Sequence, residues 1–171
     1  MPRRRSQHRQ PSNDNYSLYT GKGVPDYNRD WSKNLGLKAD YAVPEDLYYT
    51  KEHEWVRIEA GKCRVGVTDY AQKSLHEVVY VELPKVGSDV ANMQSLGTVE
   101  SVKAVADVYS PISGRVLEVN SGLSDAPELV NKNPYGEGWI TIIQPANLQK
   151  DLTTLMKPAQ YKELLLKISQ K

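Results

Sequence analysis

The segment GTVESVKAVADVYSPISGRV, residues 97–116, constrains the fold more than any other part of the chain. Its residues are mostly small or β-branched, which favours strands with a buried face, yet Lys103 lies in the middle. One continuous strand would place Val99 and Val105 on the face of the lysine and Val102 on the other, so both faces would be apolar. A tight turn at residues 102–103 resolves the conflict, because the segment then folds into a hairpin with the ammonium at its tip in water.

This expected turn contains no Gly, Pro, Asn or Asp and therefore departs from ordinary turn chemistry. Such local departures concentrate at functional sites. A lysine at a rigid hairpin tip suits covalent attachment, since acylation needs an accessible amine. A long side chain then lets a tethered group move between separate active sites at an effective concentration set by the arm length. The alternative is an ordinary solvent-facing lysine, which leaves the turn unexplained.

Further short strands, separated by turn residues, are predicted from Glu54 onward. Each is alternating or β-branched and ends at a Gly, Pro, Ser or Asn signal. The expected strands are EWVRIE (54–59), CRVGV (63–67), VVYVEL (78–83), GTVESV (97–102), AVADVY (104–109), GRVLEV (114–119) and GWITII (138–143). Strands this short and this evenly spaced predict a small barrel or sandwich.

Helices are expected at two places. A short one near 69–75 would begin at Thr68 or Asp69 as the N-cap. At the C-terminus the apolar spacing changes to that of a helix after Asn147, is interrupted by Pro158, and then resumes. The apolar positions are Leu148, Leu152, Leu155, Met156, Tyr161, Leu164, Leu165 and Ile168. We interpret these as two amphipathic helices packed on the β body; a partner-binding helix is the alternative.

The charge is unevenly distributed along the 171 residues. Residues 1–43 carry a net charge of +4 and residues 44–171 a net charge of −3. We therefore predict a basic, partly disordered extension over 1–43 and a folded domain over 44–171, and no nucleic-acid binding by that domain. No apolar run is long enough to span a membrane. The single cysteine, Cys63, excludes an intrachain disulfide and reads as a buried hydrophobe.

Several enzyme signatures are incomplete. HEWVR at 53–57 lacks the second histidine of a zinc-protease helix, and the three histidines have no metal-ligand spacing. The glycine pairs at 21–23 and 136–138 lack the rest of a phosphate loop. The sequence therefore predicts neither a catalytic residue nor a metal site.

The residues around Lys103 closely resemble the lipoyl-attachment segment of glycine cleavage system H proteins. Three more segments agree in order and spacing: YTKEHEWV (49–56), VGVTDYAQKSL through VVYVELPKVG (65–87) and NPYGEGW (133–139). The resemblance extends over residues 44–171. It implies a mainly β barrel-sandwich hybrid of the lipoyl and biotinyl carrier (hammerhead) type and a non-catalytic carrier, with the short helix near 69–75 and C-terminal helices.

The resemblance also implies roles for individual residues. Lys103 would carry one covalent lipoate, and Glu100 and Gly114 match positions read by lipoate-attaching enzymes. Glu54 and Asp107 match acidic positions that receive the aminomethyl-loaded arm, whose amine is cationic at neutral pH.

The implied function is a relay in which this chain is carrier and substrate. A pyridoxal-phosphate glycine decarboxylase (P protein) loads the aminomethyl group, an aminomethyltransferase (T protein) passes it to tetrahydrofolate, and a dihydrolipoyl dehydrogenase (L protein) reoxidises the dithiol. A lipoate-attaching enzyme is the further partner. An H-like protein that donates its lipoyl group to other enzymes is an alternative, and the same motifs would serve it.

Other carriers fit less well. A biotin carrier would have methionines beside the lysine, where Val102 and Ala104 stand here. A lipoyl domain of a 2-oxoacid dehydrogenase usually lacks the HEW and PYGEGW segments. Two positions depart from the family: Ser74 stands where many H proteins have histidine, and His76 replaces a glycine. Either His76 takes over the missing contact or it is a surface residue. The expected compartment is the cytoplasm, with the mitochondrial matrix as alternative.

Overall fold

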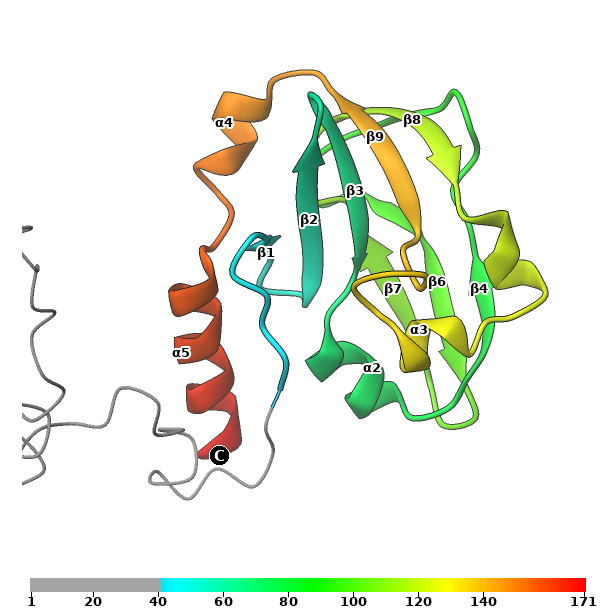
Figure 1. The fold of residues 1–171 in the computed structure, drawn as a ribbon, viewed down its shortest axis with the longest axis vertical. Coiled ribbons are helices and arrows are strands. Elements are labelled where there is room, and N and C mark those ends of the chain that lie inside the picture. The colour runs from blue at the N-terminus through cyan, green and yellow to red at the C-terminus, as the bar shows by residue number, and fades with distance from the viewer. Residues whose placement is uncertain (1–40) are drawn as a thin grey trace, which may run out of the picture. The chain divides into compact units, whose positions relative to one another are not determined.

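The structure, a computed structural model, describes residues 41–171 and forms two antiparallel sheets (Figure 1). The six-stranded sheet has the order β1-β2-β3-β9-β8-β5, and the three-stranded sheet the order β4-β6-β7. The strands are β1 (Tyr48–Tyr49), β2 (Glu54–Glu59), β3 (Lys62–Val67), β4 (Val78–Glu82), β5 (Asp89–Val90), β6 (Ser95–Ser101), β7 (Val105–Tyr109), β8 (Gly114–Val119) and β9 (Thr141–Pro145). The predicted mainly β, two-sheet fold is confirmed. The extension predicted over 1–43 lies outside the described residues except for residues 41–43.

The helices are α2 (Asp69–Leu75), α3 (Leu129–Lys132), α4 (Leu148–Leu152) and α5 (Pro158–Ser169), with a 3₁₀ turn over Ser121–Ser124. The Thr68 hydroxyl accepts a hydrogen bond from the Ala71 amide, which makes Thr68, one of the two predicted candidates, the N-cap of α2; Asp69 is the first residue of the helix. Asn147 caps α4 in the same way, through the Lys150 amide. Both sequence signals therefore marked real helix starts.

The first C-terminal helix is shorter than the apolar spacing predicted. It ends at Leu152, and Met156 instead pairs with Tyr49 through two backbone hydrogen bonds of 2.9 and 2.8 Å. Pro158 disfavours a helical conformation of the residue before it, and Lys157 is extended (ψ 163°). The segment between the helices therefore continues the edge of the sheet beside β1.

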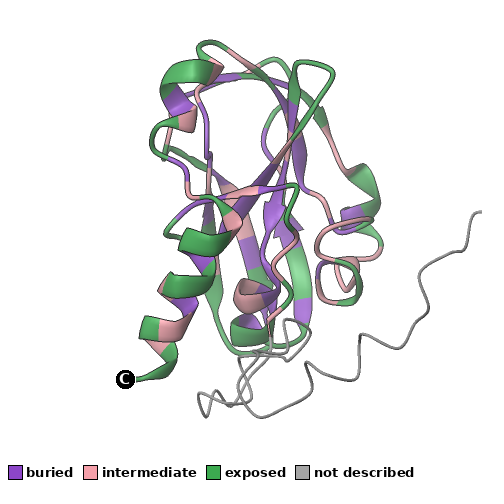
Figure 2. Cartoon of the chain, turned by 60° about the vertical axis from the view of Figure 1, so that its left-hand side comes forward, coloured by how far each residue is buried: buried purple, intermediate pink, exposed green. Residues whose placement is uncertain are grey.

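The buried residues, purple in Figure 2, come from strands of both sheets. Most members of the main core cluster are aliphatic. Cys63 is fully buried within it, as expected for a small hydrophobe. A second, aromatic cluster lies under α5, where the Tyr161 ring stacks on Tyr49 with centroids 4.5 Å apart. The apolar face of α5 is thus used for core packing, in agreement with the interpretation preferred above.

Among residues 41–171 no helix is long and apolar enough to cross a membrane. The helices α2 and α3 lie at the end of the sandwich where β6 turns into β7 (Figure 1).

Candidate functional site

Lys103 lies at the tip of the β6–β7 hairpin, which has the turn that its sequence predicted. Glu100 pairs with Val105, and the Ser101 amide donates a hydrogen bond of 2.8 Å to the Ala104 carbonyl. The lysine side chain is exposed, and no hydrogen bond or ion pair within residues 41–171 engages its ammonium. The amine is therefore available to a reactant from solution.

The Ser101 hydroxyl closes the turn. It accepts hydrogen bonds from the Lys103 amide (3.2 Å) and the Ala104 amide (3.0 Å), and it donates to the Ala104 carbonyl (3.2 Å). Serine at the first position of a turn is itself a turn signal. The sequence-based expectation considered only Gly, Pro, Asn and Asp and therefore left Ser101 out. The turn therefore follows ordinary chemistry, supplied by a side chain that is only 7% exposed.

A second support comes from a segment far away in the sequence. The Val102 amide donates to the Glu77 carbonyl (3.0 Å), and Asn131 holds the residues on either side of Glu77. Its Oδ1 accepts from the Val78 amide (2.9 Å) and its Nδ2 donates to the His76 carbonyl (2.7 Å). No local sequence signal marked Asn131, because its partners lie more than fifty positions away.

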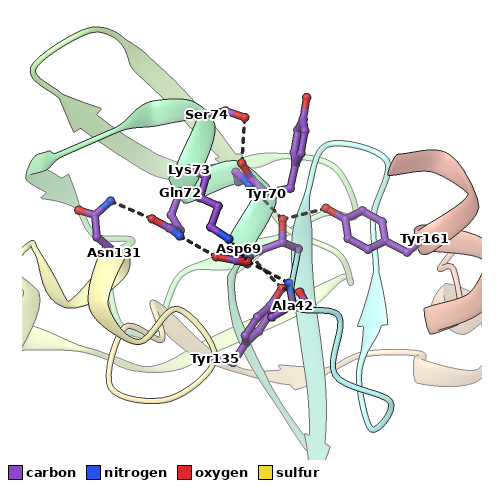
Figure 3. A network of polar contacts seen from close by, with 11 residues as sticks. Ala42, Asp69, Tyr70, Gln72, Lys73, Ser74, Asn131, Tyr135 and Tyr161 are labelled. Atoms are coloured by element: carbon purple, nitrogen blue, oxygen red, sulfur yellow. Dashed lines mark hydrogen bonds and ion pairs between the residues drawn. The ribbon is translucent and has the colours of Figure 1, made fainter. Parts of the chain in front are cut away.

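The helix α2, which leads into this segment, is anchored by Asp69 (Figure 3). Its carboxylate accepts from the Ala42 amide (2.9 Å), Gln72 Nε2 (2.7 Å) and Lys73 Nζ (2.9 Å). Burial alone would raise the pKa of Asp69, but these hydrogen bonds outweigh it and hold the pKa below its usual value. The hydroxyl of Tyr135 joins the same network, donating to the Ala42 carbonyl. Residues 41–43 thus contact the folded body.

The two residues expected in lipoylation recognition lie in different places. Glu100 is exposed on β6, three residues before Lys103 and directly opposite Tyr80 on β4. Gly114 lies past the other end of β7, about 17 Å of strand from the tip at ~3.3 Å per residue. A Cβ on Gly114 would meet the Gln144 carbonyl oxygen at 2.0 Å. The structure therefore brings Glu100, but not Gly114, to the lysine.

Glu54 and Asp107 occupy contrasting environments. Glu54 is 1% exposed, and its carboxylate accepts hydrogen bonds from the Thr50 hydroxyl and the Tyr109 amide, the latter at 2.9 Å. Burial raises the pKa of Glu54, against the opposing effect of these two donors. Asp107 is exposed on β7 and accepts from the Ser95 hydroxyl (3.1 Å). Among the described residues, no hydrogen bond joins the two carboxylates. Asp107 belongs to β7, and Glu54 bonds to that strand through the Tyr109 amide.

The two positions that depart from the family pattern are exposed. The Ser74 hydroxyl donates to the Tyr70 carbonyl of its own helix at 2.8 Å (Figure 3). His76 ends α2 with φ 65° and ψ −148°, a conformation that essentially only glycine adopts without strain. The backbone at this position thus explains why a glycine suits it.

The fold is a small two-sheet β domain with an exposed, unengaged lysine at a hairpin tip that hydrogen bonds fix, an arrangement suited to carrying a covalently attached group. Within residues 41–171 no group of three His, Cys, Asp or Glu side chains is placed to hold a metal. What the hairpin tip presents to solvent is the amine of Lys103.

Comparison with known proteins identifies the kind of carrier. The family described as "Glycine cleavage H-protein" matches residues 47–168. A probable glycine cleavage system H protein of Pyrococcus abyssi is 54% identical over 128 residues, covering 74% of this chain and 95% of that protein. The H protein of an Anaeromyxobacter species is 55% identical over 120 residues, covering 70% and 93%. The crystal structure of an H protein from Mycobacterium marinum superposes with a TM-score of 0.64 at 36% identity, covering 71% and 97%.

The chain therefore belongs to the glycine cleavage H-protein family, the non-catalytic lipoyl carriers of the glycine cleavage system. This confirms the family, the fold and the carrier role that the sequence predicted.

Proposed function

We propose that Lys103 is the residue that carries the lipoyl group in this chain. The observation that carries the proposal is the exposed, unengaged amine on a turn fixed by Ser101 and by the Glu77 carbonyl. These residues fit the group, because an amide at Nζ needs an accessible amine and displaces no buried contact. When attached, lipoate supplies the disulfide that takes up the aminomethyl group of glycine.

Glu100 and Gly114 are proposed to matter for lipoylation in different ways. Glu100 offers an exposed carboxylate close to the lysine, suitable for direct contact with the attaching enzyme. Gly114 acts through the fold, because a side chain there would push β8 away from β9 and shift the strand that follows the hairpin.

Asp107 and Glu54 are proposed to receive the cationic loaded arm. Asp107 makes the first contact, since its carboxylate is exposed on the hairpin that bears Lys103. Glu54 is buried on β2, and it fixes β7 through the Tyr109 amide. Docking of an amine on these carboxylates would keep water from releasing the aminomethyl group.

The proposed partners are the enzymes of the glycine cleavage system: the decarboxylase, the aminomethyltransferase and the dihydrolipoyl dehydrogenase, together with a lipoate-attaching enzyme. The relatives compared above are archaeal and bacterial proteins, which supports the cytoplasm as the compartment.

The test is peptide mass spectrometry of the full chain from its native host, followed by reconstitution with purified glycine decarboxylase. A lipoyl mass on Lys103 alone, and glycine-dependent CO2 exchange that disappears in Lys103→Arg, are the expected results. A bare Lys103 in cells that lipoylate other proteins would refute the attachment site. A lipoylated chain that is inactive with the decarboxylase but passes its lipoyl group to other apo-proteins would point instead to the lipoyl-donor function.

A further inference from the structure

The outer face of the three-stranded sheet carries an ordered row of side chains beside Lys103. Tyr80 on β4, Glu100 on β6 and Val105 on β7 are direct partners across the sheet. The next row along, Val81 and Val99, points into the core, with exposures of 3% and 0%. The row that contains Glu100 therefore faces solvent across all three strands.

Exposed apolar side chains gather in this region. Four of the eight large hydrophobic side chains that are exposed within residues 41–171 lie around the turn. They are Val79 (47% exposed), Tyr80 (54%), Val102 (67%) and Val105 (63%). We call these four residues and Glu100 the tip face. Clustering of this kind, as opposed to single scattered hydrophobic residues, marks an interaction surface.

The same face is acidic. Glu82 and Asp107 lie two positions further along the strands from Tyr80 and Val105, on the same side of the sheet as Glu100. All three carboxylates are exposed, and none takes part in the ion pairs found among residues 41–171. A partner that covers this face would therefore need an apolar surface with basic groups beside it.

The position of the tip face limits which enzyme can use it. The Lys103 ammonium first loses one proton, and the amine then joins the acyl carbon of activated lipoate. The bond from that carbon to the adenylate phosphate oxygen breaks, AMP leaves, and Nζ loses a second proton as the amide forms. The reacting atom is then only a four-carbon stem away from the turn, so the attaching enzyme must touch the residues beside it. Enzymes that act on the sulfur end of the long arm need no such contact.

We propose that the tip face is the docking surface for the lipoate-attaching enzyme, with Tyr80 and Val105 as apolar anchors on either side of Glu100. This rests on the proposed function of Lys103 as the lipoylated residue. Tyr80 is the main anchor, because large aromatic side chains are enriched among the few residues that contribute most of the binding energy at an interface.

The test measures acceptor kinetics with unlipoylated full-length chain, an ATP-dependent lipoate–protein ligase and free lipoate. Tyr80→Ser should raise KM about tenfold and Val105→Thr about threefold, with kcat unchanged. Val86→Thr is the control for Val105→Thr, since Val86 is similarly exposed (54%, against 63% for Val105) but lies beyond the far end of β4. KM of the wild type should rise with ionic strength, and this dependence should weaken in Glu100→Gln.

A second measurement tests whether the tip face serves the attaching enzyme alone or also the enzymes that act on the lipoyl arm. The variants are driven to full lipoylation with excess ligase and then assayed as acceptors for glycine decarboxylase, where the wild-type rate is expected. The docking proposal would be overturned if Tyr80→Ser and Val105→Thr left the KM of the ligase unchanged. It would also be overturned if the fully lipoylated variants lost as much activity with the decarboxylase as with the ligase. Failure of the ligase to acylate wild-type Lys103 would instead overturn the proposed function and the docking surface together.

Discussion

Two hairpins of this protein close in different ways. The β2–β3 hairpin turns through Ala60 and Gly61, both with positive φ (49° and 77°), so backbone conformation alone reverses the chain. The β6–β7 hairpin turns through Val102 and Lys103, which do not adopt positive φ. It is closed by the Ser101 hydroxyl and fastened to the Glu77 carbonyl.

The open ends of both hairpins have a backbone contact between flanking residues, and in β6–β7 it joins the Ser110 amide to the Gln94 carbonyl (2.8 Å). In β2–β3 the Thr68 amide donates to the His53 carbonyl (2.9 Å), a backbone contact between the flanking residues. In β6–β7 the last residue, Tyr109, donates its amide to the buried carboxylate of Glu54 from the other sheet. The β6–β7 hairpin thus has, beyond its own backbone contacts, a partner from a distant segment at each end: the Glu77 carbonyl at the tip and the Glu54 carboxylate at the open end.

The largest expected effect comes from removing the side chain that holds the open end of β6–β7. Glu54→Ala leaves the Tyr109 amide and the Thr50 hydroxyl without their acceptor and creates a cavity, so the free energy of unfolding should fall by about 3 kcal/mol in urea titrations. Glu54→Gln keeps the shape and one acceptor and should lose less than half as much. If the free energy of unfolding of Glu54→Ala lay within about 1 kcal/mol of the wild-type value, the Glu54 carboxylate would not be what holds the open end of β6–β7.

The next effect concerns the tip. Ser101→Ala removes three hydrogen bonds of the turn, so the lysine should be presented in many orientations and kcat/KM for lipoylation should fall about tenfold. Ser88→Ala is the control, because the Ser88 hydroxyl also bonds within a turn, to the Lys85 carbonyl, but far from the lysine. If both variants were lipoylated at the same rate, the hydrogen bonds of Ser101 would not be needed to orient Lys103.

Substitutions at two positions with positive φ should change the free energy of unfolding in opposite directions. Gly61→Ala should lower the free energy of unfolding by about 1 kcal/mol, because open space surrounds the new Cβ and only backbone strain is added. His76→Gly should raise it by a similar ~1 kcal/mol, since it relieves a strained conformation. Thermal unfolding measures both, and lipoylation rates should stay unchanged in Gly61→Ala. Destabilisation by His76→Gly would show that contacts of the imidazole outweigh the strain.

The smallest effect is the pH response at the open end of β2–β3. Burial lowers the pKa of His53 from 6.5, against a weaker opposing effect of the Glu52 carboxylate. Below pH 6.5 the unfolded chain therefore binds the proton before the folded one does, and stability falls on acidification. The raised pKa of Glu54 acts in the opposite sense nearer pH 4.5.

A comparison of variants isolates this response. His53→Asn suits the positive φ of the position and keeps a hydrogen-bonding side chain for the Tyr161 hydroxyl. Chemical denaturation between pH 5 and pH 8 should show a smaller loss of stability in this variant than in wild type. If the free energy of unfolding changed with pH equally in the variant and the wild type, His53 would not be the titrating group.

Local signals accounted for much of the architecture. Alternation and turn residues predicted the main strands, Thr68 and Asn147 predicted two helix starts, and Lys103 predicted the hairpin tip. The two-residue strands β1 and β5 were not predicted, because so short an element has no period and exists only through its partner. The helix α4 was predicted too long, since pairing of Met156 with Tyr49 overrode the apolar spacing.

The sequence by itself determined that a lysine would stand at a hairpin tip, because an ammonium within an apolar run has only one inexpensive place, in water. Tertiary structure alone decided what holds that tip. Asn131, Glu77 and Glu54 act through hydrogen bonds between residues far apart along the chain, and no local pattern encodes such pairs. It also decided that Glu54 is buried and Asp107 exposed, since the burial of a carboxylate depends on which strand covers it.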